Sequence, residues 1–183
     1  MNRNFLDEEE RILLATVRDF ANEVLAPRAA AYDRSEEFPW ENMKGIAELG
    51  LLGLTIDEKY GGAGGTTRQL ALVVQEIAKA CASTSVIYVA HLSLCTQFIN
   101  MFGKESQKAK YIPSLVSGRK IGAFALTEPG AGSDAAAIET SSREDGETFI
   151  LNGTKTYISN APEAEVIVTL VTNDTEKGHR SID

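Results

Sequence analysis

Residues 124–137 read "FALTEPGAGSDAAA", and this stretch places an acid, a proline, two glycines, a serine and an aspartate directly after an apolar run. One interpretation is a helix capped by Ser133 or Asp134 and continued by "AAAIET". Against it, a hairpin signal at Asp145-Gly146 follows closely, and residues 138–142 alternate in polarity as a strand does. The glycines therefore call for another explanation.

That explanation is a loop shaped to hold a ligand. Gly130 and Gly132 permit backbone conformations closed to other residues, and without side chains they let a bulky ligand approach the main chain. Successive N–H groups would face an anionic group there, and the Ser133 hydroxyl would be a further donor. The stretch is neither a dinucleotide fingerprint nor a Walker loop. From the residues alone, a plain turn or cap and a binding loop both remain open.

A second cluster favours the binding loop. If "TKTYIS", residues 154–159, is a strand, its period of two places Tyr157 and Ser159 on one face. A half-buried tyrosine beside a surface serine is the structural alternative. An aromatic ring and a hydroxyl near a phosphate-type loop would suit a flat, polar-edged cofactor with a phosphate tail.

The first part of the chain reads as helices. Asp7 followed by Glu10 resembles a capping box, and Thr66 with Gln69 resembles another. "ASTS", after Cys81, is expected to break or bend a helix. We expect helices up to Pro27, over Trp40–Leu49, from Thr66 through Cys81, over the apolar residues Val86–Phe102, and over residues 105–112 with an end near Pro113.

After Gly118 the pattern changes to that of strands, with Asp145-Gly146 and Asn152-Gly153 as hairpin signals. The expected strands are residues 121–126, 138–143, 147–151, 154–159 and 165–171. The sequence thus predicts an α+β multidomain chain, with an all-α domain at 1–119 and an antiparallel β-domain at 120–183.

Composition excludes several classes of function. Of the 183 residues, 43% are apolar, so the chain can bury a core. Lys and Arg number 18 against 26 Asp and Glu, and the net charge of -8 has the wrong sign for general binding to nucleic acid or anionic membrane. The start "MNRNFLDEEE" lacks a secretory pattern, and no apolar stretch approaches ~20 residues. We expect a cytoplasmic protein with no nucleic-acid or membrane partner.

The histidines and cysteines give no metal site. His91 and His179 lie far apart, with no Cys or His at metal-ligand spacing. Cys81 and Cys95 would lie about 21 Å apart on one continuous helix, too far to pair. We expect both to be free core residues in a reducing compartment.

The motifs resemble those of a known family. "ALTEPGAGSDAAA", Ala125–Ala137, matches every position of the signature of acyl-CoA dehydrogenases. "EKYGGAGG", "FGKESQKAKYIPSLVSG" and "LNGTKTYISNA" resemble further segments of that family in the same order and spacing. The similarity runs over essentially the whole chain.

The resemblance implies FAD-dependent α,β-desaturation of an acyl-CoA thioester, in which a carboxylate takes the α-proton and the β-hydrogen leaves as hydride to flavin N5. The residues it places against FAD are Phe124, Ala125, Leu126, Thr127, Gly132, Ser133, Tyr157, Ile158 and Ser159. Those it places near the substrate are Ser133, Ile87, Ala90, His91 and Leu94, the last four on the helix that shapes the acyl cavity.

Some of these assignments compete with plainer interpretations. The four helix residues are at least as well read as ordinary core, and His91 is better read as a hydrogen-bonded core residue than as a base. The family uses Glu128 structurally, so we do not assign it as the base. Tyr157-Ile158-Ser159 departs from the commoner Trp-Ile-Thr, which keeps the ring and the hydroxyl but affects packing and redox tuning.

The family fold also has a complete β-barrel and a C-terminal four-helix bundle. The resemblance implies that the barrel is incomplete here, that the bundle is absent, and that the catalytic glutamate lies in the missing part. We therefore expect an N-terminal fragment that is inactive alone, from a protein that is tetrameric when full-length and passes electrons to an electron-transfer flavoprotein. The alternatives are a non-catalytic flavin or acyl-CoA binding module and a structural or interaction protein.

Overall fold

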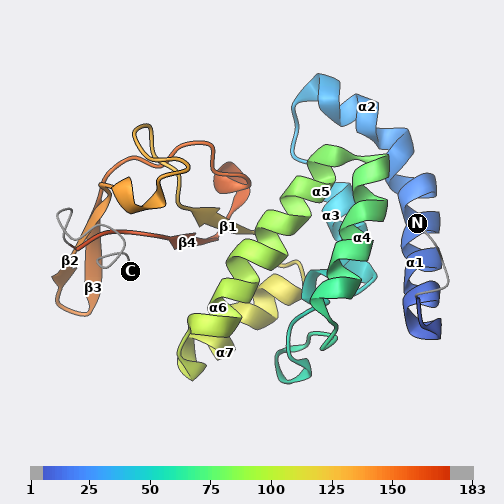
Figure 1. Ribbon diagram of the computed structural model, residues 1–183, viewed down its shortest axis with the longest axis horizontal. Helices are drawn as coiled ribbons and strands as arrows, with labels where there is room; N and C mark the ends of the chain where they lie inside the picture. Colours follow the sequence, from blue (N-terminus) through green and yellow to red (C-terminus); the bar gives the residue numbers. More distant parts are fainter. Residues whose placement is uncertain (1–5, 174–183) are drawn as a thin grey trace.

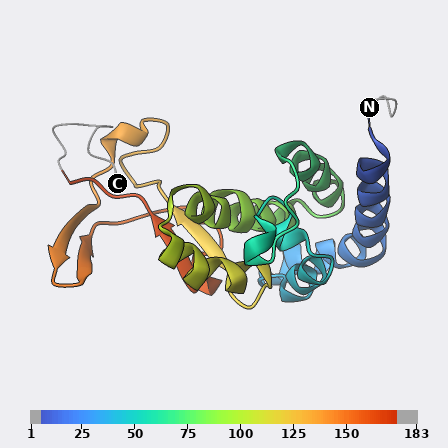
Figure 2. The same cartoon turned by 90° about the horizontal axis from the view of Figure 1, so that it is seen from below.

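The computed structural model describes residues 6–173, which form a set of helices followed by two small sheets (Figure 1). Helix α1 (Glu8–Phe20), the π-helical turn η2 (Ala21–Leu25) and α2 (Ala26–Ser35) follow one another without a break, and α2 runs in a different direction from α1 (Figures 1 and 2). The expected end at Pro27 is wrong, because the wider π turn before it accommodates a residue that donates no backbone hydrogen bond.

The remaining helical elements of the described residues lie between residues 40 and 163. They are α3 (Trp40–Glu48), η3 (Leu51–Gly53), η4 (Glu58–Tyr60), α4 (Thr67–Ala80), α5 (Ala82–Val89), the π-helical η5 (Ala90–Thr96), α6 (Gln97–Phe102), α7 (Glu105–Val116), η6 (Ala135–Ala137) and η7 (Ala161–Glu163).

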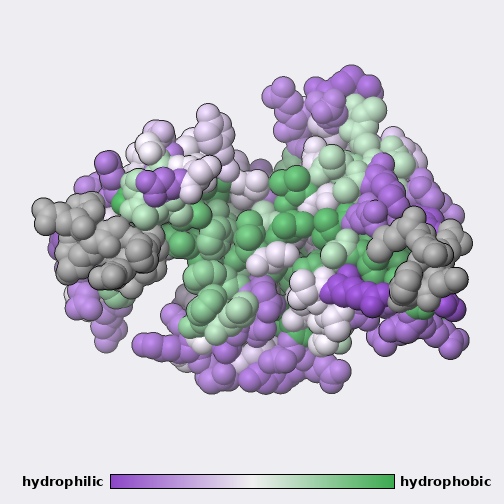
Figure 3. Space-filling view, viewed as in Figure 1, coloured by the Kyte–Doolittle hydropathy of each residue, from purple (hydrophilic) through white to green (hydrophobic). Residues whose placement is uncertain are grey.

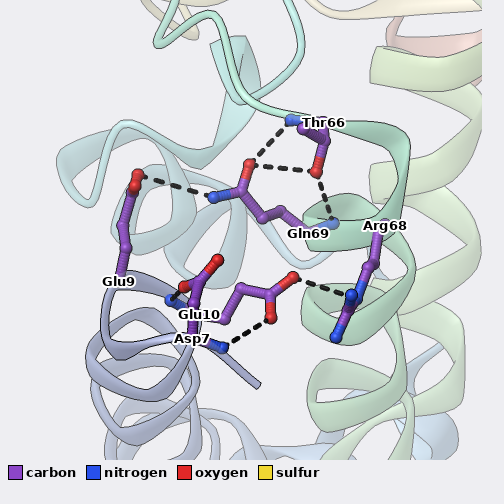
Figure 4. A network of polar contacts seen from close by, with 6 residues as sticks. All are labelled: Asp7, Glu9, Glu10, Thr66, Arg68 and Gln69. Atoms are coloured by element: carbon purple, nitrogen blue, oxygen red, sulfur yellow. Dashed lines mark hydrogen bonds and ion pairs between the residues drawn. The ribbon is translucent and has the colours of Figure 1, made fainter. Parts of the chain in front are cut away.

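Both predicted capping boxes are present, and they lie side by side (Figure 4). The Glu10 amide donates to Asp7 Oδ1 over 2.8 Å, and the Gln69 amide donates to Thr66 Oγ1 over 3.2 Å. Arg68 Nε lies 3.0 Å from Glu10 Oε1, which joins the starts of α1 and α4. Local sequence therefore determines where both helices begin.

The central helix is continuous from Ala82 to Phe102 through α5, η5 and α6. It is separated from α4 at Cys81 (φ -152°), one residue before the "ASTS" stretch in which a break or bend was expected, and residues 82–85 are themselves helical. Its 21 residues, with a mean hydropathy of 1.3 in the most apolar window, are enough by length and composition to cross a membrane. The expectation that no apolar stretch approaches ~20 residues is therefore wrong. Its Tyr88 and Leu92 are fully buried, as in a core helix.

Helix α7 also continues past a proline. It runs through Pro113 to Val116, so the expected end near Pro113 is wrong. The last turn stays helical because Ile112, Leu115 and Val116 are buried in the core. This packing outweighs the loss of one backbone hydrogen bond at the proline.

Up to residue 173, the β-region has two separate two-stranded sheets. Strands β2 (Ser141–Asp145) and β3 (Thr148–Asn152) form an antiparallel hairpin at the end of the molecule opposite α1 (Figure 2), and Gly146 (φ 64°) lies in its turn as predicted. Strands β1 (Gly122–Ala125) and β4 (Val166–Thr169) pair in parallel, so the purely antiparallel arrangement was wrong.

Residues 154–159 are not a strand, which corrects a further prediction. The Thr156 amide donates to the Thr127 carbonyl over 2.9 Å, and Tyr157 has a left-handed backbone (φ 56°). Tyr157 and Ser159 therefore do not share the face of a pleated strand. Elsewhere, Cys81 and Cys95 are both free and buried, as expected.

Candidate functional site

The loop after β1 closes on itself. The Glu128 amide donates to the Ala131 carbonyl over 2.9 Å, and the Ala131 amide donates to the Glu128 carbonyl over 3.1 Å. Asp134 precedes the short turn η6, Ala135–Ala137, and makes no side-chain cap there. The interpretation as a helix cap is therefore wrong.

The two glycines of this loop leave open space. Neither Gly130 nor Gly132 has a left-handed φ, so the backbone argument for glycine fails at both positions. A Cβ at either one would meet no heavy atom within 4 Å. Gly132 and Ser133 are exposed, while Leu126 and Thr127 are half-buried. The absent side chains therefore leave the main chain accessible, as a bound cofactor would require.

Glu128 holds the loop together. Its carboxylate accepts hydrogen bonds from the amides of Glu139 (2.7 Å) and Thr140 (3.0 Å) and from Lys155 Nζ (2.7 Å). Burial alone raises the pKa of Glu128, but the hydrogen bonds from Lys155 and from the amides outweigh it and hold the pKa at about 2. This carboxylate is ionised and fully engaged, which is the structural role predicted for it.

The two predicted flavin segments are residues 124–133 and residues 154–159, and the second lies against the first. Lys155 Nζ donates to the Leu126 carbonyl over 2.9 Å, and the Thr156 amide bonds the Thr127 carbonyl. Next to these contacts the Tyr157 side chain is 92% exposed on a left-handed backbone. Such a conformation is uncommon outside glycine and tends to occur at functional sites. Ile158 is half-buried and Ser159 is exposed.

The start of the first segment is also fixed. Phe124 is half-buried, with its ring centroid 5.6 Å from that of Phe98 on α6, and Ala125 is buried. Asn160, directly after Ser159, donates to the Gly122 carbonyl over 3.0 Å. The structure thus brings the two predicted flavin segments together at both of their ends.

His91 is a buried, neutral core residue. Its Nδ1 accepts from the Gly122 amide over 3.0 Å, and its Nε2 lies 3.1 Å from the Leu115 carbonyl. Burial lowers the pKa of His91 to about 4, although the bond to Leu115 opposes this shift. Both ring nitrogens are used, which agrees with the interpretation as hydrogen-bonded core and leaves none for a substrate.

The other predicted acyl-site residues lie at different depths of the central helix. Ala90 is buried, Ile87 is half-buried and Leu94 is 43% exposed. Figure 3 shows a band of apolar surface across the middle of this face, over the central helix. The exposed large apolar residues of that helix are Val86, Leu94, Met101 and Phe102.

Two hollows in the described structure lie elsewhere. One, of about 250 Å³, is lined by α3 residues together with Gly118 and Ile121. The other, of about 440 Å³, lies between α6, α7 and β4 and includes Phe98 and Phe102. Neither of these two hollows is lined by Ser133 or Tyr157. Within residues 6–173, no group of three or more His, Cys, Asp or Glu side chains forms a metal site.

Two contributors to this face were not predicted from the sequence. Lys155 and Asn160 both join the flavin segments, yet neither belongs to the loop motif. The only signal for them was their place within "LNGTKTYISNA". Their partners lie far away in the sequence, so spacing could not reveal these contacts.

A helical domain followed by a β-region, with two loop segments held against each other, places the chain in the α+β class of proteins. Two family descriptions match the chain: "Acyl-CoA dehydrogenase, N-terminal domain" over residues 7–119 and "Acyl-CoA dehydrogenase, middle domain" over residues 123–183. The chain belongs to the acyl-CoA dehydrogenase family, as its motifs predicted.

Individual relatives agree. A short-chain specific acyl-CoA dehydrogenase of Clostridium acetobutylicum is 40% identical over 97% of this chain and 47% of the relative. Butyryl-CoA dehydrogenase of Megasphaera elsdenii has a TM-score of 0.90 at 36% identity, over 100% of this chain and 48% of the other. Glutaryl-CoA dehydrogenase of Mycobacterium smegmatis, solved with FADH2, has a TM-score of 0.90 at 35% identity, over 94% and 45%. The chain spans about half the length of these relatives.

Proposed function

We propose that this chain supplies the flavin-binding face of an acyl-CoA dehydrogenase, an oxidoreductase that introduces an α,β double bond into an acyl-CoA thioester. The observation that carries the proposal is Tyr157, which is 92% exposed on a left-handed backbone, in the segment that Lys155 and Thr156 tie to the loop after β1. A ring with so little protein cover is suited to stacking on a flat cofactor. The family membership and the relative solved with FADH2 support FAD as that cofactor.

The residues present fit FAD. Leu126 and Thr127 would lie near the flavin ring, with Tyr157 packed beside it. The open main chain at Gly132 and the exposed Ser133 hydroxyl would meet the phosphates. Phe124, Ala125, Ile158 and Ser159 complete the proposed contact set. Bound there, FAD supplies the hydride acceptor of the reaction.

We propose that this chain supplies a smaller share of the lining of the substrate site than of the flavin face. Ser133 would lie where the thioester passes, and Ile87, Ala90 and Leu94 would shape the acyl cavity. His91 lies on the same helix, but it is buried and both of its ring nitrogens bond to backbone groups. On the family basis, the proton-abstracting carboxylate is proposed to lie outside residues 1–183. Glu128 is not proposed for this role, because its carboxylate accepts three hydrogen bonds.

Membership of the acyl-CoA dehydrogenase family is also the basis for what we propose about the full-length protein and its tetramer. The β-region would be the start of a barrel, and a C-terminal four-helix bundle would supply the catalytic glutamate and most subunit contacts of a tetramer. Electrons would pass to an electron-transfer flavoprotein. Two free, buried cysteines support a cytoplasmic, reducing location.

Flavin binding and turnover test this proposal. The purified chain is titrated with FAD while flavin fluorescence and absorbance are recorded, and acyl-CoAs of several lengths are then added with an electron-acceptor dye. We expect weak FAD binding and no dye bleaching by the chain alone, and both activities once the downstream polypeptide is supplied. Bleaching of the dye by the chain alone would contradict the claim that the chain lacks the catalytic base. If FAD does not bind even when the downstream polypeptide is supplied, the proposal that the chain is part of an FAD-dependent enzyme fails.

A further inference from the structure

Gly122, at the start of β1, has both of its backbone polar groups bonded to buried side chains. Its amide donates to His91 Nδ1 over 3.0 Å, and its carbonyl accepts from Asn160 Nδ2 over 3.0 Å. The exposed fractions of His91 and Asn160 are 0% and 6%. One edge of this strand is therefore held by two side chains where a neighbouring strand would otherwise pair.

The same two side chains reach further elements. His91 Nε2 lies 3.1 Å from the Leu115 carbonyl of α7, and Asn160 Nδ2 lies 3.1 Å from the Ile87 carbonyl of α5. Because Nδ1 accepts a hydrogen bond, Nε2 carries the proton and donates to Leu115. A single clamp thus joins α7, the central helix, β1 and the turn at Asn160.

The clamp leaves little freedom at its centre. A Cβ on Gly122 would lie 2.7 Å from Cys95 Sγ, so only glycine lets β1 pack this closely on the central helix. Asn160 has a left-handed backbone (φ 69°), which asparagine adopts more readily than most residues. Both positions therefore suit the residue type that occupies them.

The clamp lies at the root of both proposed flavin segments. Gly122 precedes Phe124 by two residues, and Asn160 directly follows Ser159. At the far end the segments are tied by Lys155 to the Leu126 carbonyl. There Lys155 also donates to Glu128, and the Thr156 amide donates to the Thr127 carbonyl. The path of residues 157–159 relative to residues 124–127 is thus set by hydrogen bonds at both ends.

We infer that His91 and Asn160 are positioning residues, which hold the two flavin-contacting segments in the relative placement that FAD requires. The inference rests on the proposed function and deepens it. Neither side chain contacts the cofactor, because both are directed to buried backbone groups. Their effect passes through Gly122 to the segments on either side.

Three substitutions test the clamp. His91→Leu removes both ring hydrogen bonds, whereas His91→Gln keeps one donor and one acceptor. Asn160→Gly keeps the left-handed backbone accessible and removes only the amide. Amide hydrogen exchange is measured on the chain without FAD, and FAD affinity is measured by fluorescence at a temperature where far-UV circular dichroism shows each variant folded. We expect His91→Leu and Asn160→Gly to speed exchange over residues 122–133 and 155–160 and to weaken FAD binding at least ~10-fold, with substantial rescue in His91→Gln.

Asn42→Ala is the matched control. Asn42 is fully buried and donates to Thr84 Oγ1 over 3.0 Å, and its Oδ1, like that of Asn160, has no hydrogen-bond partner. Its loss removes a similar buried bond within the helical domain. We expect a lower Tm with unchanged FAD affinity.

The outcomes distinguish a failure of this inference from a failure of the proposed function. Wild-type FAD affinity in His91→Leu and Asn160→Gly would overturn the inference, as would an equal loss in Asn42→Ala, which would show a general effect of stability. If His91→Leu fails to fold, Asn160→Gly decides. If the wild-type chain binds no FAD even with the downstream polypeptide, the proposed function fails, while hydrogen exchange still decides whether the clamp orders the two segments.

Discussion

Lys155 Nζ lies 2.7 Å from Glu128 Oε1, and the two side chains are only 11% and 6% exposed. The ammonium also donates to the Leu126 carbonyl. Because buried charges are costly unless paired and hydrogen-bonded, each group depends on the other. The pair therefore fastens the loop at residues 126–131 to the segment that carries Tyr157.

Neutralising Glu128 should destabilise the fold. Glu128→Gln leaves Lys155 without its counter-charge, and we expect the free energy of unfolding at pH 7 to fall by about 3 kcal/mol. The folded-state pKa of Glu128 is about 2, below its ordinary 4.5, so its contribution is complete above pH 4.5 and is lost as the pH falls towards 2. Urea denaturation across this range should show that the difference between wild type and variant shrinks with acidification.

Glu139→Gln is the control for that measurement, because Glu139 is exposed and only its backbone amide reaches Glu128. We expect it to change stability by no more than about 0.5 kcal/mol. A constant difference between wild type and Glu128→Gln from pH 7 to pH 2 would contradict the role of this carboxylate.

His91 should give a separate pH dependence. Its folded-state pKa is about 4, below its ordinary 6.5, because burial disfavours the charged ring. The unfolded chain takes up a proton below pH 6.5 that the folded chain resists, so stability should fall by about 3 kcal/mol between pH 6.5 and pH 4. Denaturation of His91→Gln should lack this component. Equal slopes in wild type and variant would show that His91 does not titrate as its burial requires.

Gly132→Ala should separate binding from folding. Its φ lies outside the left-handed region and a Cβ there meets nothing within 4 Å, so stability should change by no more than about 0.5 kcal/mol. The same methyl group would occupy the space proposed for the cofactor, so fluorescence titration should show weaker FAD binding. Gly122→Ala is the contrasting variant, with an expected loss of about 1–3 kcal/mol because its Cβ would meet Cys95. Unchanged FAD affinity in Gly132→Ala would remove this glycine from the site.

The features that the sequence predicted well are local ones. The capping boxes at Asp7 and Thr66 depend on partners three residues away, and the turn at Gly146 depends on its own backbone conformation. The ends at Pro27 and Pro113 were wrong because tertiary packing and a π turn override the preference of a single residue. The local preference of a residue determines where a helix begins or ends only if tertiary packing does not override it.

In the candidate site, too, local features were predicted from the sequence and long-range contacts were not. The loop motif identified a contiguous stretch, but Lys155 meets Glu128 across 27 positions and Asn160 meets Gly122 across 38. Alternating polarity suggested a strand at residues 154–159, where bonds to the loop impose an irregular path. Contacts between residues so far apart in the sequence form only in the folded chain, and they produce no periodic pattern in the sequence.

Tyr157 offers the most direct test of the flavin face. Tyr157→Asn removes the ring and places a residue that tolerates φ near 56°. Since the tyrosine is 92% exposed, little packing is lost, and stability should stay within about 0.5 kcal/mol of wild type. FAD binding should weaken, because the stacking surface is gone. Tyr157→Phe keeps that surface and should bind FAD like wild type in the same titration, whereas equal affinity of Tyr157→Asn and Tyr157→Phe would show that the ring does not contact the cofactor.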